Sequence, residues 1–234
     1  MSVLNVTNIS RNGNDTLCVI MPCFNTRPEL LRAAIQSVDQ ERSLINELGF
    51  DTSMILVDDC STSANTKSAL KEIEQAYDWV EVTLLMKNHG PAGARNKALL
   101  QCDSNWVAFL DSDDYWIQGG ISSLCKILIN NPSIEWISGD FFLVENNDDL
   151  PNSTFYPNHP DRYEYVKTAF KQNKEIRLEK PIREFLEGSL CSMGSCIISK
   201  NALEVIGFFN GRQRKGVDTE LYWRLARSFD MIFV

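Results

Sequence analysis

Pairs of acidic residues stand directly after two apolar stretches of the sequence, where their carboxylates can act together. Asp58 and Asp59 follow the stretch 54–57, and Asp111 and Asp113 follow 106–110 in an Asp-x-Asp spacing. Proteins usually hold Mg²⁺ or Mn²⁺ by one or two carboxylates together with substrate phosphates. Such an ion acts as a Lewis acid that neutralises charge on a leaving diphosphate. The spacing therefore predicts a divalent-cation site at Asp111 and Asp113.

The same residue types also serve as helix caps and turn residues, and this alternative stays open for both aspartate pairs. It weighs more for Asp58 and Asp59 than for the second pair. Other metal chemistry is not expected, because His89 and His159 are the only histidines and neither has a partner at ligand spacing. The seven cysteines contain no Cys-x-x-Cys pair, so the sequence predicts no structural zinc site.

The elements that must carry these acids are short apolar runs that alternate with amphipathic segments. Four runs predict strands, at 17–21, 54–57, 80–85 and 106–110, with helical spacing of apolar residues between them. Fully apolar runs separated by helices are typical of strands covered on both faces, which favours a mainly parallel sheet. Ligands bind beyond the carboxyl ends of the strands in such a sheet. The acidic residues are therefore expected at one edge of the sheet.

The second half of the sequence is less regular, and its predicted elements are shorter. We expect strands at 135–144, 190–199 and 231–234, helical segments within 162–187, and helices at 201–206 and 218–227. The tryptophans at 116, 136 and 223 fit a core role better than a sugar-stacking role. Because the chain stops on a predicted strand, a minimal domain and a domain truncated at its C-terminus both stay open.

The composition is that of a globular protein and excludes several functional classes. There are 23 Lys and Arg residues against 31 Asp and Glu residues, a formal net charge of −8, whereas nucleic-acid-binding proteins usually carry a clustered basic face. We therefore expect no nucleic-acid partner. No apolar stretch approaches the ~18 residues of a transmembrane helix, and the N-terminus lacks a signal-peptide pattern. The sequence predicts a cytoplasmic protein, and peripheral contact with the inner face of the cytoplasmic membrane stays open.

Several segments, taken in order, resemble the motifs of family 2 glycosyltransferases. The matching segments are Val19–Asn25, Val57–Thr62, Gly90–Asn96, Phe109–Trp116, Ile206–Asn210 and Val217–Arg224. The resemblance covers about residues 17–230. It implies the GT-A fold, an α/β, Rossmann-like, three-layer sandwich whose mainly parallel central sheet has helices on both faces. It also implies a flexible leader at 1–16, a nucleotide-sugar-binding half at 17–115 and an acceptor-side half of the same domain at 116–234.

The resemblance implies roles for individual positions on the donor side. Asp59 matches the acid that accepts a hydrogen bond from the base of the nucleotide, and a carboxylate suits a ring N–H donor. Arg95 matches a residue that faces the donor, and an exposed arginine on an amphipathic helix stays open as its alternative. Of the two implied metal ligands, Asp113 is expected to bind the ion directly. The implied donor-binding residues are Pro22, Phe24, Asn25, Asp58, Asp59, Arg95, Asp111, Ser112 and Asp113.

Asp218 matches the catalytic base of the family. An inverting transfer needs a group that removes the acceptor hydroxyl proton while the oxygen attacks the anomeric carbon from the face opposite the diphosphate. The family usually has Glu-Asp at this point, whereas this sequence has Val217 before Asp218. A helix N-cap is the alternative role for Asp218, and a helix N-terminus also favours its ionised form.

The resemblance implies an inverting glycosyltransferase that uses Mg²⁺ or Mn²⁺ and a nucleoside-diphosphate sugar, with a UDP-sugar favoured. The acceptor is expected to be a hydroxyl of a saccharide or a lipid-linked molecule, in polysaccharide or glycolipid assembly. The basic stretch at 211–216 is either a mobile loop that closes over the diphosphate or a solvated turn. The sequence predicts neither the individual acceptor nor the oligomeric state.

Three alternatives to this function stay open. A sugar-nucleotide pyrophosphorylase shares a related sheet, but its Gly-rich, basic N-terminal loop is absent and Pro22–Asn25 stands there instead. A non-catalytic module that binds nucleotide sugars would leave the donor intact. A domain that depends on another part to complete its acceptor site is the third.

Overall fold

A computed structural model describes residues 15–143, 172, 175–187, 190–213 and 215–234. The first half contains β1 (Asp15–Cys23), α1 (Pro28–Glu47), β2 (Phe50–Asp58), α2 (Ala64–Ala76), β3 (Val80–Leu84), α3 (Gly90–Gln101) and β4 (Trp106–Phe109). The second half contains α4 (Gly120–Asn130), β5 (Trp136–Ser138), β6 (Ile176–Leu178), α6 (Ile182–Glu187), a 3₁₀ turn (Met193–Ser195), β7 (Cys196–Ser199), α7 (Lys200–Ile206), α8 (Val217–Ser228) and β8 (Met231–Phe233).

The predicted leader at 1–16 lies outside the described residues up to position 14, and β1 already begins at Asp15. The first four predicted strands are confirmed, and the apolar runs form the centres of β1, β2, β3 and β4. Among the described residues, no helix combines the length and the apolar character needed to cross a membrane.

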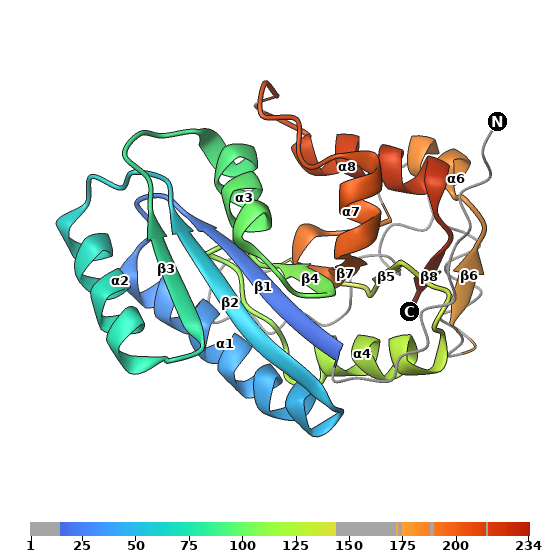
Figure 1. The fold of residues 1–234 in the computed structure, drawn as a ribbon, viewed down its shortest axis with the longest axis horizontal. Helices are drawn as coiled ribbons and strands as arrows, with labels where there is room; N and C mark the ends of the chain where they lie inside the picture. The colour runs from blue at the N-terminus through green and yellow to red at the C-terminus, as the bar shows by residue number, and fades with distance from the viewer. Residues whose placement is uncertain (1–14, 144–171, 173–174, 188–189, 214) are drawn as a thin grey trace.

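The described strands form one eight-stranded sheet in the order β3-β2-β1-β4-β7-β5-β8-β6 (Figure 1). The pairings β3–β2, β2–β1, β1–β4 and β5–β8 are parallel, and β4–β7, β7–β5 and β8–β6 are antiparallel. The mainly parallel sheet is thus confirmed, with its parallel part formed by the first half of the chain. The carboxyl ends of β1, β2 and β4 consequently meet at one edge.

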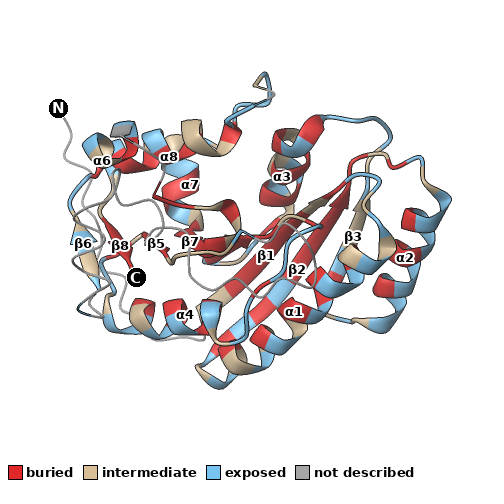
Figure 2. Cartoon of the chain, turned by 180° about the vertical axis from the view of Figure 1, so that it is seen from behind, coloured by how far each residue is buried: buried red, intermediate tan, exposed pale blue. Residues whose placement is uncertain are grey.

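Helices cover both faces of the sheet and make three layers (Figures 1 and 2). Leu17, Val19 and Met21 of β1 pack in one apolar cluster with α1, α2 and α4, whereas Cys18 and Ile20 pack in a second cluster with α3, α7 and α8. This alternation follows from the two-residue period of a strand. Each large apolar side chain buried in this way contributes roughly 1.5–3 kcal/mol to the free energy of unfolding.

The second half departs from the sequence prediction in the lengths of its strands. The predicted strand at 135–144 is only three residues long in β5 (Trp136–Ser138), and just one further N–H, that of Gly139, donates across to the carbonyl of Ser195 at 2.9 Å. The strand predicted at 190–199 is only β7, because Ser192 and Ser195 cap each other in the 3₁₀ turn before it. Local serine hydrogen bonds of this kind compete with strand pairing.

β6 (Ile176–Leu178) lies where helical segments were predicted, at 162–187, and the part of that range up to 171 lies outside the described residues. β6 is an edge strand of the sheet and pairs antiparallel with β8, so tertiary pairing outweighs its local pattern. The core role expected for the tryptophans is confirmed for Trp136, whose ring is fully buried against Phe185 and Tyr222, and is wrong for Trp223, which is 41% exposed.

Candidate functional site

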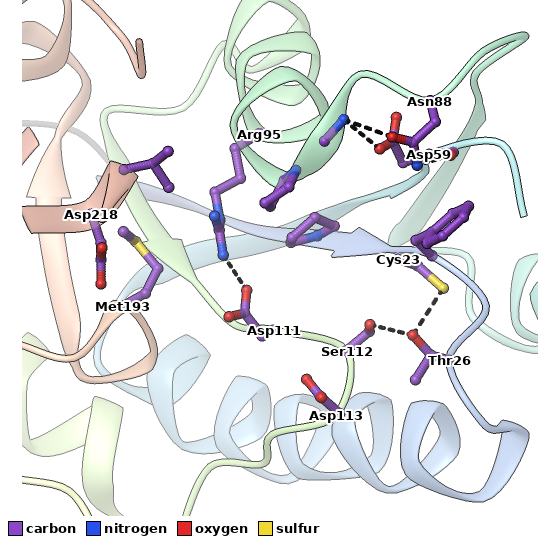
Figure 3. Close-up of a pocket in the computed structure, with 15 residues that line it drawn as sticks. Cys23, Thr26, Asp59, Asn88, Arg95, Asp111, Ser112, Asp113, Met193 and Asp218 are labelled. Carbon is purple, nitrogen blue, oxygen red and sulfur yellow. Dashed lines mark hydrogen bonds and ion pairs between the residues drawn. The ribbon is translucent and has the colours of Figure 1, made fainter. Parts of the chain in front are cut away.

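A pocket of about 610 Å³ opens at the carboxyl ends of β1, β2 and β4 (Figure 3). This volume is within the ~300–1,000 Å³ that is typical of small-molecule sites. Of the predicted site residues, it is lined by Pro22, Phe24, Asp59, Arg95, Asp111, Ser112, Asp113 and Asp218. The lining residues for which no role was predicted are Cys23, Thr26, Asn88, Gly90, Pro91, Met193 and Val217. Residues more than 190 positions apart in the sequence thus face one cavity.

Asp59 connects the end of β2 to the start of α3. Its carboxylate accepts hydrogen bonds from the backbone N–H groups of His89 and Gly90, both at 2.7 Å, and the side chain is almost fully buried. Asn88 adds a hydrogen bond from its amide to the Asp59 carbonyl at 3.1 Å. The free N–H groups at a helix N-terminus favour a negative partner. Asp59 therefore fixes α3 against the pocket, and each carboxylate oxygen retains a lone pair for a further donor.

Asp58 and Asn25 do not line the pocket, although donor-binding roles were predicted for both. Asp58 accepts a hydrogen bond from the Ser61 N–H at 3.1 Å and another from the Ser61 hydroxyl. Asn25 has a φ of 52°, and its side-chain oxygen accepts from the N–H groups of Thr62 at 2.8 Å and Ser63 at 2.9 Å. Both side chains hold the loop at 61–63, which is the turn role left open for aspartate after β2.

Arg95 is buried and points into the pocket, where it forms an ion pair with Asp111 (Figure 3). The alternative of an exposed arginine on a helix surface is therefore wrong, since Arg95 is only 4% exposed. Its Nε atom is buried and makes no hydrogen bond among the described residues. A buried charge needs compensation, and Asp111 supplies it on one side only. The guanidinium consequently keeps donor capacity for a negative ligand in the pocket.

The loop after β4 carries the Asp-x-Asp pair. Ser112 and Thr26 share a hydrogen bond of 2.7 Å between their hydroxyls, which ties the loop to the segment after β1. Desolvation, followed by the charges of Asp111 and Asp113, raises the pKa of Asp114 to about 6. The side chain of Asp113 is exposed and makes no hydrogen bond within the described part of the chain. The loop is therefore a concentration of negative charge that favours a cation.

The residues present fit a divalent cation that shares its ligands with a phosphate group. No group of three or more His, Cys, Asp or Glu side chains in the described ranges is arranged to hold a metal by itself. Asp111 and Asp113 offer only hard carboxylate oxygens, which suit Mg²⁺ or Mn²⁺ and leave most of the coordination shell to water or phosphate. Cys23, also in the lining, is a weak ligand because burial raises the pKa of its thiol.

Asp218 enters the same pocket from the second half of the chain (Figure 3). It is the second residue of α8, whose N-cap is Gly216 at a φ of 61°. The cap-only role for Asp218 is therefore wrong. Its side chain projects from the first turn of α8 and lines the pocket. A carboxylate aimed into the pocket is suited to accept a proton.

Two polar side chains of α1 hold the segment that follows the Asp-x-Asp pair and leads into α4. Glu41, with no exposed surface, accepts hydrogen bonds from the N–H of Ser122 at 2.8 Å and from that of Gly119. Trp116 donates its backbone N–H to the Ser37 hydroxyl at 3.0 Å and its indole N–H to the Gly194 carbonyl at 2.8 Å. No role was predicted from the sequence for Ser37 and Glu41. Both are polar residues on the apolar stripe of α1, and a polar residue at such a position indicates a buried hydrogen-bond partner.

Comparison with known proteins identifies relatives for most of the chain. The family model described as "Glycosyl transferase family 2" matches residues 18–207. The UDP-Glc:alpha-D-GlcNAc-diphosphoundecaprenol beta-1,3-glucosyltransferase WfgD of Escherichia coli is 31% identical over 131 residues, which is 55% of this chain and 47% of that protein. The chain spans less than half the length of the first curated relatives that it matches.

Two solved structures share the fold. Staphylococcus aureus TarS 1–349, solved in complex with UDP-GlcNAc, superposes with a TM-score of 0.67 at 19% identity over 94% of this chain and 56% of that chain. The mannosyltransferase PcManGT from Pyrobaculum calidifontis, solved with GDP-Man and Mn²⁺, superposes with a TM-score of 0.63 at 16% identity over 93% of this chain and 54% of that chain. At these identities the likeness establishes the fold, which confirms the GT-A architecture.

Proposed function

Because the chain belongs to glycosyltransferase family 2, whose model matches residues 18–207, we propose that it transfers a sugar from a nucleoside diphosphate to an acceptor hydroxyl with inversion. The observation that carries the proposal is the convergence of Arg95, Asp113 and Asp218 on one pocket from both halves of the chain. The side of the pocket with Arg95 and Asp113 can bind an anionic leaving group, and Asp218 on the other side can take a proton from a nucleophile.

On the donor side, Arg95 and the start of α3 bind the diphosphate and Asp59 binds the base. The guanidinium of Arg95, which pairs with Asp111 through Nη2 alone, and the positive end of α3 suit a phosphate. Asp59 lies beside that helix start with lone pairs available for a base N–H donor. A UDP-sugar is the favoured donor, in keeping with the UDP-GlcNAc bound by the structurally similar TarS.

Asp111 and Asp113 hold Mg²⁺ or Mn²⁺, with Asp113 as the direct ligand because Asp111 already pairs with Arg95. When bound there, the ion supplies positive charge that neutralises the departing diphosphate. PcManGT, which shares the fold, was solved with Mn²⁺ and a nucleotide sugar, and this supports the assignment.

Asp218 is the general base. Its carboxylate removes the proton of the acceptor hydroxyl while the oxygen forms a bond to the anomeric carbon. The bond from that carbon to the diphosphate breaks, and its electron pair leaves with the nucleoside diphosphate. Attack from the face opposite the leaving group inverts the anomeric centre, so an α-linked donor gives a β-linked product.

The acceptor is a saccharide, carried on a lipid diphosphate, in the assembly of a cell-envelope polysaccharide or glycolipid. The supporting observation is the similarity to WfgD, which is named for such an acceptor. Its chemistry would bring the protein to the inner face of the cytoplasmic membrane.

The test is donor turnover. The protein is incubated with Mn²⁺ and a panel of UDP-glucose, UDP-N-acetylglucosamine and GDP-mannose, and release of the nucleoside diphosphate is measured with and without saccharide acceptors. We expect release from at least one donor and its loss in Asp113→Asn. Asp103→Asn, an exposed aspartate at the opposite end of β4, is the matched control and should keep wild-type turnover.

Two other outcomes distinguish the alternatives. Tight binding of an intact donor without turnover, unchanged in Asp218→Asn, would identify a non-catalytic binding module. Formation of a nucleotide sugar from a nucleoside triphosphate and a sugar phosphate would identify a pyrophosphorylase. Either result contradicts the proposed transfer.

A further inference from the structure

A four-residue segment before α8, Ile206–Phe209, is held by side chains from two different helices. It starts at the last residue of α7 and passes through Gly207, whose φ of 81° is readily adopted only by glycine. The chain then leads to Gly216 and into α8, which carries Asp218. Contacts that connect this segment to α8 therefore bear on the position of Asp218.

On the α3 side, Asn96 holds the segment with both ends of its side-chain amide. Its Nδ2 donates to the carbonyl of Phe209 at 2.8 Å, and its Oδ1 accepts from the N–H of Phe209 at 2.9 Å. One side chain thus satisfies a backbone donor and acceptor together, as a neighbouring strand would. Asn96 directly follows Arg95, so the contact connects Phe209 to the turn of α3 that faces the pocket.

The ring of Phe209 strengthens this connection. It packs edge-on against Phe109 of β4, with ring centroids 5.4 Å apart and an interplanar angle of 88°. The guanidinium carbon of Arg95 lies 5.6 Å from the centroid of the same ring. Arrangements of both kinds are attractive because of the ring quadrupole. Phe209 therefore touches the donor side of the pocket through its backbone and its side chain.

On the α8 side, Arg224 binds the three preceding carbonyls of the segment. Its Nη1 donates to the carbonyls of Ile206, at 2.8 Å, and Gly207, and its Nη2 donates to that of Phe208 at 2.9 Å. Glu220, one turn earlier on α8, orients the guanidinium through contacts of 2.8 Å to Nε and 2.7 Å to Nη2. This set of hydrogen bonds to three carbonyls and one carboxylate needs the planar, five-donor guanidinium of arginine, which lysine lacks.

We propose that Asn96 and Arg224 are positioning residues that hold Asp218 in register with Arg95 across the pocket. The proposal rests on the proposed transferase function, in which Asp218 is the base. Neither residue lines the pocket, so both act through the segment Ile206–Phe209. A general base must lie about 2.6–3.2 Å from the hydroxyl that it deprotonates. A misplacement of ~1 Å can cost about 100-fold in rate, so this link matters for turnover.

The kinetic test separates binding from turnover. Asn96→Ala is expected to lower kcat for donor turnover about tenfold or more, since it frees Phe209 from α3. Its affinity for UDP with Mn²⁺, measured by titration calorimetry, should stay within about twofold, because the donor-side residues keep their contacts. Arg224→Lys should lower kcat less than Arg224→Ala, since lysine keeps the charge but reaches fewer carbonyls.

Matched controls exist for both residues. Asn105 bridges β4 to Thr16 of β1 with its side-chain oxygen, 2.9 Å from the Thr16 hydroxyl, at the far end of the sheet from the pocket. Arg227 is exposed on the same helix as Arg224. Asn105→Ala and Arg227→Ala should both keep wild-type kcat. An equal fall of kcat in Asn96→Ala and Asn105→Ala would show a general loss of stability and overturn the proposal.

Hydrogen exchange tests the link without any assay of activity. The Phe209 amide, which donates to Asn96, should exchange about tenfold faster in Asn96→Ala than in Asn105→Ala. Unchanged exchange at Phe209, or a wild-type kcat in Asn96→Ala, overturns the positioning role. Accelerated exchange together with a wild-type protein that turns over no nucleotide sugar would instead overturn the proposed function, so the two failures are distinguishable.

Discussion

Arg95 of α3 and Asp111 of the loop after β4 form an ion pair across the floor of the pocket, and Arg95 is buried while Asp111 stays partly exposed. The pair joins the helix start that Asp59 fixes to the loop that carries Asp113. It also compensates one of the two carboxylates of the Asp-x-Asp pair. Of that pair, Asp113 is thus left available to a cation.

Replacing Arg95 should lower the affinity of the protein for the donor. We expect Arg95→Ala to reduce UDP affinity in the presence of Mn²⁺ by about tenfold or more, because a charged hydrogen bond to phosphate is lost. Arg95→Lys should lie between this variant and the wild type. Arg32→Ala is the control, since Arg32 forms an ion pair with Glu72 that is exposed on both sides. Equal UDP affinity in all four proteins would contradict the role of Arg95.

Removal of divalent cations should abolish most donor binding. The loop holds three aspartates within four positions, at 111, 113 and 114, and a diphosphate adds further negative charge. We expect UDP binding measured by calorimetry to become at least about tenfold weaker in EDTA and to return on addition of Mn²⁺. Binding that is equally tight in EDTA would exclude a metal from the donor site.

Loss of the buried carboxylate of Glu41 should destabilise the protein. Glu41→Gln leaves at most one acceptor for the two N–H groups of Gly119 and Ser122, and an unsatisfied buried donor costs about 1–3 kcal/mol. The free energy of unfolding in urea measures this cost. Glu47→Gln, at an exposed position of the same helix, should change it by less than about 0.5 kcal/mol. Equal stability of the two variants would show that the Glu41 carboxylate does not stabilise the start of α4.

Cys102 should be alkylated before Cys125, although both thiols are buried. Hydrogen bonds from Cys18 and Ser104, together with the charge of Lys200, lower the pKa of the Cys102 thiol, whereas burial raises the pKa of Cys125 to about 12. Because the thiolate is the nucleophile, iodoacetamide at neutral pH should modify Cys102 faster than Cys125, as measured by mass spectrometry. Modification of Cys125 before Cys102 would contradict the prediction.

The first half of the fold was predictable because its signals are local. The apolar runs at 17–21, 54–57 and 106–110 each fill a strand that is buried on both faces, so the sequence pattern and the tertiary environment agree. The acids after these strands share an edge for a topological reason, which requires no knowledge of side-chain contacts. Seven of the nine predicted donor-binding residues line the pocket, and three of them, Asp59, Asp111 and Asp113, follow from this logic.

The parts of the fold and of the site that were not predicted depend on contacts between residues that are distant in the sequence. The turn roles of Asp58 and Asn25 arise from partners at 61–63, and the sequence does not distinguish such a role from ligand binding. Arg224 and Asn96 could not be assigned from spacing, because each binds backbone groups that lie 16 to 18 and 113 positions away. β6 pairs with β8, which lies more than 50 positions further along the chain.

A comparison of turnover and binding in Asp218→Asn tests the proposed inverting transfer. With the donor that the wild type uses, we predict a fall in kcat of about 10²–10⁴-fold, the usual contribution of a general base, while the UDP affinity with Mn²⁺ stays unchanged. Asp103→Asn, in the same assay, should match the wild type. A turnover of Asp218→Asn that equals that of the wild type would contradict the assignment of Asp218 as the base and, with it, the proposed inverting transfer.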